Sequence, residues 1–254
     1  MQMITLHSEE TWPASLKSYL ERNLQLFASW EFRDTKHAFQ KVQTWEYDSA
    51  IYGLRDVLNN HALHGYHCTR LTDVEIDGIL SEGMSLQNKD TLSARINQLL
   101  LEGKISEHIG HRLKNENQAN EEYRSHMLWF CFFEPQLAGE SGIKRFFRSW
   151  GGEALYNSHE SDPETGIVLS AIGTPCLIEA EVPISILNQH SFLAMKVVRN
   201  FLKNRDYDMK ECIDHEGYAT NNLDSCFIKR VMKYPDSDFI RLTGCDEWDD
   251  PNLL

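Results

Sequence analysis

Residues 66–84 read YHCTRLTDVEIDGILSEGM and combine a strand-like segment with a helix-start signal. Thr72 and Glu75 form the S/T-x-x-E capping box that satisfies main-chain amides at the start of a helix. Apolar residues then recur at helical spacing up to Gly83, where a left-handed C-terminal cap is expected. The pattern therefore predicts a strand that ends at the polar trio 67–69 and a helix that begins directly after it.

The composition of the whole chain sets limits on its class. It has 254 residues, enough to bury a large core in one domain or in one domain with an extension. Hydrophobic residues make up 41% and charged residues 25%, as in ordinary globular proteins. The net charge of -13 disfavours a general electrostatic grip on nucleic-acid phosphates, although Lys144, Arg145 and Arg148 form a local basic patch.

The cysteines and the chain start bear on the compartment. The six cysteines contain no C-x-x-C pair, so no zinc ribbon or redox motif is spelled out and reduced thiols are expected. The first residues lack the pattern of a signal peptide, and no segment approaches the roughly 20 apolar residues of a membrane span. We therefore expect a cytoplasmic protein with no membrane partner.

Two regions of different character follow one another along the chain. Residues 1–60 show mostly helical periodicity and few strand signals, which predicts a helical N-terminal extension. Residues 61–254 mix strand-like and helical segments and are predicted to form the main domain.

The main domain reads as α+β. Beyond the opening strand, five segments have strand character, namely 127–133, 166–169, 176–183, 226–232 and 239–242. Helical spacing marks 92–113 with a break at Gly103, 142–159 with a break at Gly151-Gly152, and 193–202, whereas 214–224 reads as a polar loop. Regular βα units are too few for a doubly wound sheet, so a split antiparallel sheet with flanking helices is predicted, with a mixed α/β sheet as the alternative.

Two pairs of polar residues outside these segments are candidates for chemical sites. Glu107 and His111 stand at i and i+4, but no third metal ligand is spelled out nearby, so a solvated helix face is the better interpretation. His159 and Glu160 are adjacent and could form an acid–base pair, although their spacing carries little information.

The segments YHCTRL and EIDGILSEGM resemble the first motif of the ADP-ribosyltransferase fold, in which a strand ending in His-Gly-Ser/Thr precedes a helix. The resemblance is specific over about residues 63–84. It implies that NAD is the cofactor, that His67 bonds the adenosine ribose and that Thr69 supports the nicotinamide ring. It also implies that the main chain of Cys68, which replaces the usual glycine, holds the nicotinamide amide.

The resemblance further implies a catalytic glutamate that stabilises the oxocarbenium-like ribose. Two candidates compete. Glu181, with Glu179 two residues before it, resembles the Glu-x-Glu strand of one branch of the family. Glu153 follows the Gly-Gly break and precedes Tyr156, and we slightly prefer it.

Three more residues are candidates for NAD contact. Tyr156 and Trp150 could stack on nicotinamide, but aromatic residues at helical spacing are more often part of a core. Arg70 could bind the pyrophosphate bidentately, and a structural ion pair is equally plausible.

The resemblance implies a function as well. It is that of an NAD-dependent ADP-ribosyltransferase which modifies a protein or nucleic acid, as toxins and phage-defence effectors do, and which an antitoxin or inhibitor protein could neutralise. An NAD glycohydrolase and a non-catalytic binding module that retains the fold are the alternatives.

Overall fold

The computed structural model describes residues 1–32, 41–188, 192–209 and 215–249 of the chain. The strands of its sheet are β1 Gln2–Ile4, β2 His61–Leu71, β3 Leu128–Cys131, β4 Thr174–Pro183, β5 Glu216–Ala219 and β6 Ile228–Lys233. They lie in the order β5-β3-β2-β4-β6, with β1 pairing to the start of β2. The β1–β2 pair is parallel and the other pairs are antiparallel, so the α+β prediction is confirmed.

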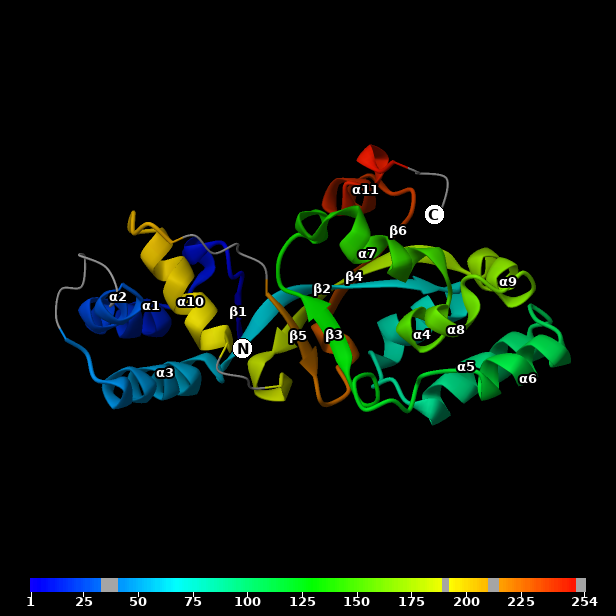
Figure 1. Ribbon diagram of the computed structural model, residues 1–254, viewed down its shortest axis with the longest axis horizontal. Coiled ribbons are helices and arrows are strands. Elements are labelled where there is room, and N and C mark those ends of the chain that lie inside the picture. Colours follow the sequence, from blue (N-terminus) through cyan, green and yellow to red (C-terminus); the bar gives the residue numbers. More distant parts are fainter. Residues whose placement is uncertain (33–40, 189–191, 210–214, 250–254) are drawn as a thin grey trace.

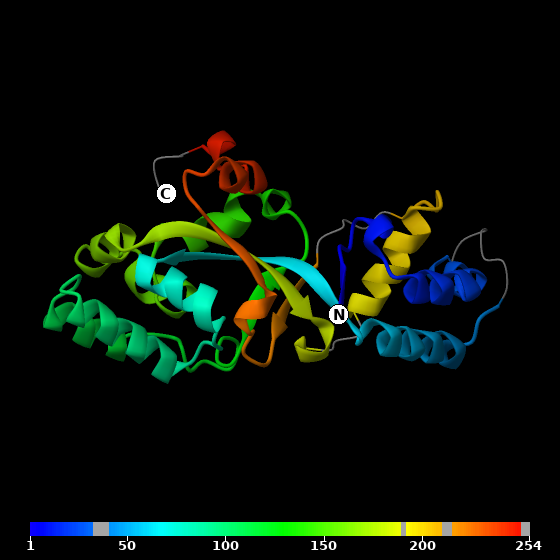
Figure 2. The same ribbon diagram turned by 180° about the vertical axis from the view of Figure 1, so that it is seen from behind.

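Helices surround this sheet along an elongated molecule (Figure 1). At one end lie α1 Ala14–Arg22, α2 Leu24–Glu31, α3 Thr44–Leu58 and α10 Phe192–Lys203. Towards the other end lie α4 Asp73–Glu82, α5 Lys89–Leu101, α6 Glu107–Asn115, α8 Tyr156–His159 and α9 Thr165–Ala171. One side of the sheet is covered by α7 Gly139–Arg148 and α11 Ser237–Thr243, as the reverse view in Figure 2 also shows.

The described residues of the segment 1–60 are mostly helical, as predicted, apart from β1, but their core is not separate. Leu16, Phe27 and Leu54 from the N-terminal helices belong to the same buried cluster as Val197 of α10 and Val182 of β4. Strand β1 also joins the main sheet through β2. The segment is therefore packed against the later part of the chain along one continuous core.

The two sides of the sheet bury different residues, and this separation organises the candidate site. Tyr66 of β2 and Leu177 of β4 pack with Phe147 of α7 and Phe239 of α11. The intervening strand residues, such as Leu71 and Ile178, pack in the large cluster on the opposite side. Neighbouring residues of a strand point to opposite faces, which explains the division.

The opening motif folds largely as predicted. Thr72 caps α4, with its hydroxyl accepting from the Glu75 amide at 3.3 Å and its own amide donating to Glu75 at 2.8 Å. Gly83 ends the helix with a φ of 94° and a ψ of -164°, a positive-φ conformation other than the expected αL cap. Strand β2 continues to Leu71, so the trio 67–69 lies inside the strand rather than at its end.

Three segments were predicted wrongly. Residues 166–169 and 239–242, expected as strands, lie in the helices α9 and α11. In α11 the buried residues Phe239, Leu242 and Thr243 follow helical spacing, and Gly244 ends the helix at a φ of 64°. The four residues 239–242 taken alone resemble a strand, because the helical spacing is visible only over a longer segment. Of the expected loop 214–224, residue 214 lies outside the described residues, and the rest contains β5, which forms through its pairing with β3 rather than through local propensity.

Candidate functional site

The candidate site is the place where β2 and β3 separate. The two strands are in register at one residue pair, Tyr66 with Cys131. From His67 to Leu71, β2 stays paired with β4, whereas in the described part of the chain its other edge faces no strand. This leaves main-chain groups of β2 without a ladder partner beside His67, and we call this opening the β2–β3 split.

His67 spans the split with its side chain. Its Nδ1 lies 2.7 Å from the carbonyl oxygen of Trp129 in β3. A carbonyl only accepts hydrogen bonds, so the proton is assigned to Nδ1. Burial lowers the pKa of the imidazole, and the nearby charge of Arg95 lowers it further. The ring is therefore neutral at pH 7, and its Nε2 is a hydrogen-bond acceptor with no partner among the described residues.

Thr69 shares a face of β2 with His67, because the two are separated by one residue. Cys68 points to the other face, where its thiol contacts that of Cys131. That contact and burial raise the pKa of the Cys68 thiol well above its ordinary value, so it stays protonated. The bulk that Cys68 adds relative to glycine is thus directed away from His67 and Thr69.

Arg70 has a structural contact. Its side chain is buried, with Nε donating to the Ile172 carbonyl at 2.8 Å and Nη1 to the Phe147 carbonyl at 2.9 Å. These bonds tie the end of α7 and the C-cap of α9 to β2. This placement does not support the alternative prediction that Arg70 binds the pyrophosphate of NAD, because its guanidinium points into the protein.

Glu75 links the end of β2 to two other elements. Besides capping α4, its carboxylate accepts from Arg95 Nε of α5 at 2.6 Å and from Trp150 Nε1 at 2.9 Å. Burial opposes ionisation of Glu75, but the Arg95 charge and these hydrogen bonds outweigh it and lower the pKa of the carboxyl. Trp150 is fully buried, so its role as core is confirmed and stacking on a ligand is ruled out in this conformation.

Glu153 lies just beyond Trp150. Gly151 and Gly152 turn the chain with φ values of 88° and 52°, and the 3-10 helix Gly152–Ala154 carries the glutamate. Tyr156 Oη donates to Glu153 Oε1 at 3.0 Å, and the Arg145 guanidinium lies 3.9 Å from the centre of the Tyr156 ring. Through Trp150 and Glu75, this segment is attached to the end of β2 that carries His67 and Thr69.

Glu179 and Glu181 lie on the opposite face of the sheet from His67. In the register of β2 with β4, Glu179 stands opposite Tyr66 and Glu181 opposite His64. Glu179 bonds His64 Nε2 at 2.8 Å and Arg230 Nε at 2.6 Å. The His64 bond is the main reason that the pKa of Glu179 falls to about 2. Glu181 is paired with Lys229 at 2.6 Å. The structure therefore brings His67 and Thr69 together but places both glutamates of β4 on the far side.

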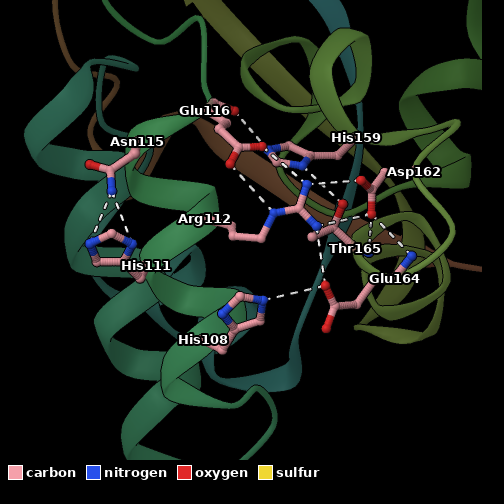
Figure 3. Close-up of polar contacts among 9 residues, drawn as sticks. All are labelled: His108, His111, Arg112, Asn115, Glu116, His159, Asp162, Glu164 and Thr165. Carbon is pink, nitrogen blue, oxygen red and sulfur yellow. Dashed lines mark hydrogen bonds and ion pairs between the residues drawn. The ribbon is translucent and has the colours of Figure 1, made fainter.

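A dense polar network joins α6 to the segment 159–165 (Figure 3). Arg112 bonds Asp162 at 2.8 Å and Glu116 at 3.1 Å and also reaches Glu164. His159 is fully buried, with Nδ1 2.9 Å from the Thr165 hydroxyl and Nε2 2.6 Å from the Glu116 carbonyl. These partners make His159 a structural residue. Glu160 pairs instead with Arg145, so the adjacent residues do not form an acid–base pair.

The described residues contain no second candidate site, neither a metal site nor a pocket of ligand size. Glu107 and His111 are exposed, and no group of three His, Cys, Asp or Glu residues in the described ranges could hold a metal ion. An apolar pocket of about 100 Å³ at the sheet edge, between Trp129, Tyr218 and the start of α10, is smaller than the roughly 300 Å³ or more of typical ligand pockets. Among the helices of the described chain, none has the length and apolar character needed to cross a bilayer.

Arg95 is a site residue that the sequence interpretation missed. It lies within the apolar series Leu92, Ile96 and Leu99 of α5, and a charged residue on a buried helical stripe was the signal that could have revealed it.

Comparison with known proteins adds no relative. No protein-family model, curated protein or solved structure matches this chain.

Proposed function

We propose that the β2–β3 split binds NAD and that the protein is an NAD-dependent ADP-ribosyltransferase acting on a macromolecular acceptor. The observation that carries the proposal is the His67–Trp129 bond across the split. It fixes the ring by Nδ1 and leaves Nε2 as an acceptor for a hydroxyl donor such as a ribose hydroxyl. Thr69 on the same face and the unpaired edge of β2 supply further polar groups for the nicotinamide carboxamide.

Glu153 is the catalytic carboxylate in this proposal. In the reaction, the bond between nicotinamide and the ribose C1′ breaks, and its electron pair leaves with nicotinamide. A carboxylate beside the ribose stabilises the positive charge that develops there. Glu153 lies three residues after Trp150, which bonds Glu75 just beyond the end of β2. Glu181 instead lies on the face of β4 that points away from His67 and is paired with Lys229.

Tyr156 and Arg70 have supporting roles here. The Tyr156 hydroxyl orients the Glu153 carboxylate by donating to it. Burial, reinforced by that nearby carboxylate, raises the pKa of Tyr156 to about 12, so the phenol keeps its proton at neutral pH. Arg70 positions β2 through its two main-chain partners and does not contact the ligand.

The test is incubation of the purified protein with NAD labelled in the adenylate phosphate, with and without a cell lysate. Transfer of label to protein or nucleic acid, with release of nicotinamide, is the expected result. Nicotinamide release without a labelled acceptor would point to an NAD glycohydrolase. Binding of NAD without consumption would point to a non-catalytic module, and absence of both binding and consumption would refute the proposal.

A further inference from the structure

The side chain of Arg95 is fixed by contacts with Glu75 and Trp150, next to the end of β2. Its Nε donates to Glu75 at 2.6 Å, and its guanidinium carbon lies 4.6 Å from the centre of the Trp150 ring. Glu75 is in turn bonded to the Thr72 amide, directly after the end of β2. The guanidinium is thereby fixed near the end of the strand that carries His67 and Thr69.

The N–H groups of Arg95 Nη2 have no hydrogen-bond partner in the described part of the chain. Arg95 Nη2 is buried from solvent and has no hydrogen-bond partner among the described residues. The same holds for Gln87 Nε2 and Arg124 Nε. A buried donor without an acceptor costs about 1–3 kcal/mol, so each of them calls for an explanation.

These donors come from segments that border the split. Gln87 forms a β-bridge with Met127, and its carbonyl accepts from the His126 amide at 2.7 Å. Arg124 stands two residues before His126, which has a positive φ of 60°. Trp129, whose carbonyl holds His67, follows two residues after Met127. The charge of Arg95 acts on His67 itself, where it lowers the pKa of the imidazole.

We propose that Arg95 Nη2 binds a phosphate oxygen of the ligand in the β2–β3 split, with Gln87 and Arg124 supplying further donors from the segments that border it. Arginine N–H groups match phosphate oxygens in charge and geometry, and a guanidinium already bonded to Glu75 and stacked on Trp150 loses little freedom on binding. The charge of Arg95 is already shared with Glu75, so what a phosphate would gain here is the N–H groups of Nη2 that no described residue uses. The inference rests on the proposed function in placing a phosphate-bearing ligand in the same split.

The test compares ligands that differ in their phosphates. Calorimetry measures binding of NAD, ADP, inorganic pyrophosphate and adenosine to the wild type and to Arg95→Met. We expect the wild type to bind ADP at least about tenfold more tightly than adenosine, and Arg95→Met to lose that preference while binding adenosine as before. Arg95→Lys, which keeps the charge but not the planar fork, should retain part of it.

Two further variants serve as controls for the effect of Arg95→Met. Arg95→Met leaves Glu75 without its cation, so the double variant Glu75→Gln/Arg95→Met removes the pair together and should show the same loss of phosphate preference. Arg112→Met, which removes an arginine whose donors are used by carboxylates in the network of Figure 3, should keep the preference.

The outcomes separate this inference from the proposed function. If NAD binds and Arg95→Met keeps the wild-type ratio of ADP to adenosine affinity, the phosphate contact is wrong and the proposed function stands. If NAD does not bind but ADP or pyrophosphate binds in a manner that depends on Arg95, the proposed function fails and the phosphate contact stands. Absence of binding of all four ligands to the wild type overturns both.

Discussion

The Nδ1 atom of His67 lies 2.7 Å from the carbonyl oxygen of Trp129 and bridges two strands that are otherwise separating. The ladder between β2 and β3 is in register at Tyr66 and Cys131 alone. One residue further along β2, a side chain provides the link between strands in place of the main chain. This contact gives His67 a defined orientation, and beyond it no described residue of β2 pairs with β3.

The hydrogen bond between His67 and Trp129 predicts how substitutions of His67 change the stability of the fold. Asparagine places an N–H donor near the position of Nδ1 and nothing at Nε2, so His67→Asn should unfold at nearly the wild-type temperature. His67→Phe loses the bond to Trp129 and should be less stable by about 1 kcal/mol. Thermal unfolding of both variants checks this, and equal losses of stability would mean that the bond to Trp129 contributes nothing.

The different surroundings of Glu153 and Glu181 predict different effects of substituting them. Glu153→Gln should reduce nicotinamide release from NAD by about a hundredfold or more, because the charge beside the ribose is lost. Glu181→Gln should stay within a few-fold of the wild type, since its partner is Lys229 on the far face. The opposite ranking in a nicotinamide-release assay would move the catalytic role to β4.

Arg70 should matter for stability. Arg70→Met leaves the buried carbonyls of Ile172 and Phe147 without a donor and should lower the free energy of unfolding by about 2–5 kcal/mol. Arg70→Lys, which can reach one of the two carbonyls, should lose less. Urea unfolding measures both. A stable Arg70→Met variant with weakened NAD binding would instead place this guanidinium on the ligand.

Glu179 predicts part of the acid sensitivity of the fold. Its pKa is lowered from an unfolded value of 4.5 to about 2, with the bond from His64 as the main cause. Its contribution to stability is therefore complete above pH 4.5 and is lost as the pH falls from 4.5 towards 2. Unfolding temperatures of the wild type should drop more steeply in this interval than those of Glu179→Gln, and the two curves should converge. Parallel curves across the interval would contradict the assignment.

The elements that local sequence determines were predictable. The capping box of Thr72 and Glu75, the long strand around Ile178 and the amphipathic helix α10 all form where their patterns indicate. Each depends on contacts that the residues make with near neighbours or on a periodicity visible over ten residues or more.

The geometry of the candidate site was harder to predict from the sequence. Alternation along β4 puts Glu179 and Glu181 on one face, but only the register with β2 reveals that His67 faces the other way. The split itself is a property of how β2 and β3 diverge, and the position of Arg95 depends on packing of α5 against Trp150. These relationships join residues far apart in the chain, so no local pattern encodes them.

The most direct test of the account is a calorimetric titration of NAD into the wild-type protein and into His67→Asn. If the β2–β3 split holds NAD through Nε2 of His67, the wild type binds and His67→Asn, folded and equally stable, binds at least about tenfold more weakly. Equal affinity of the two proteins for NAD, or no binding to the wild type, would contradict it.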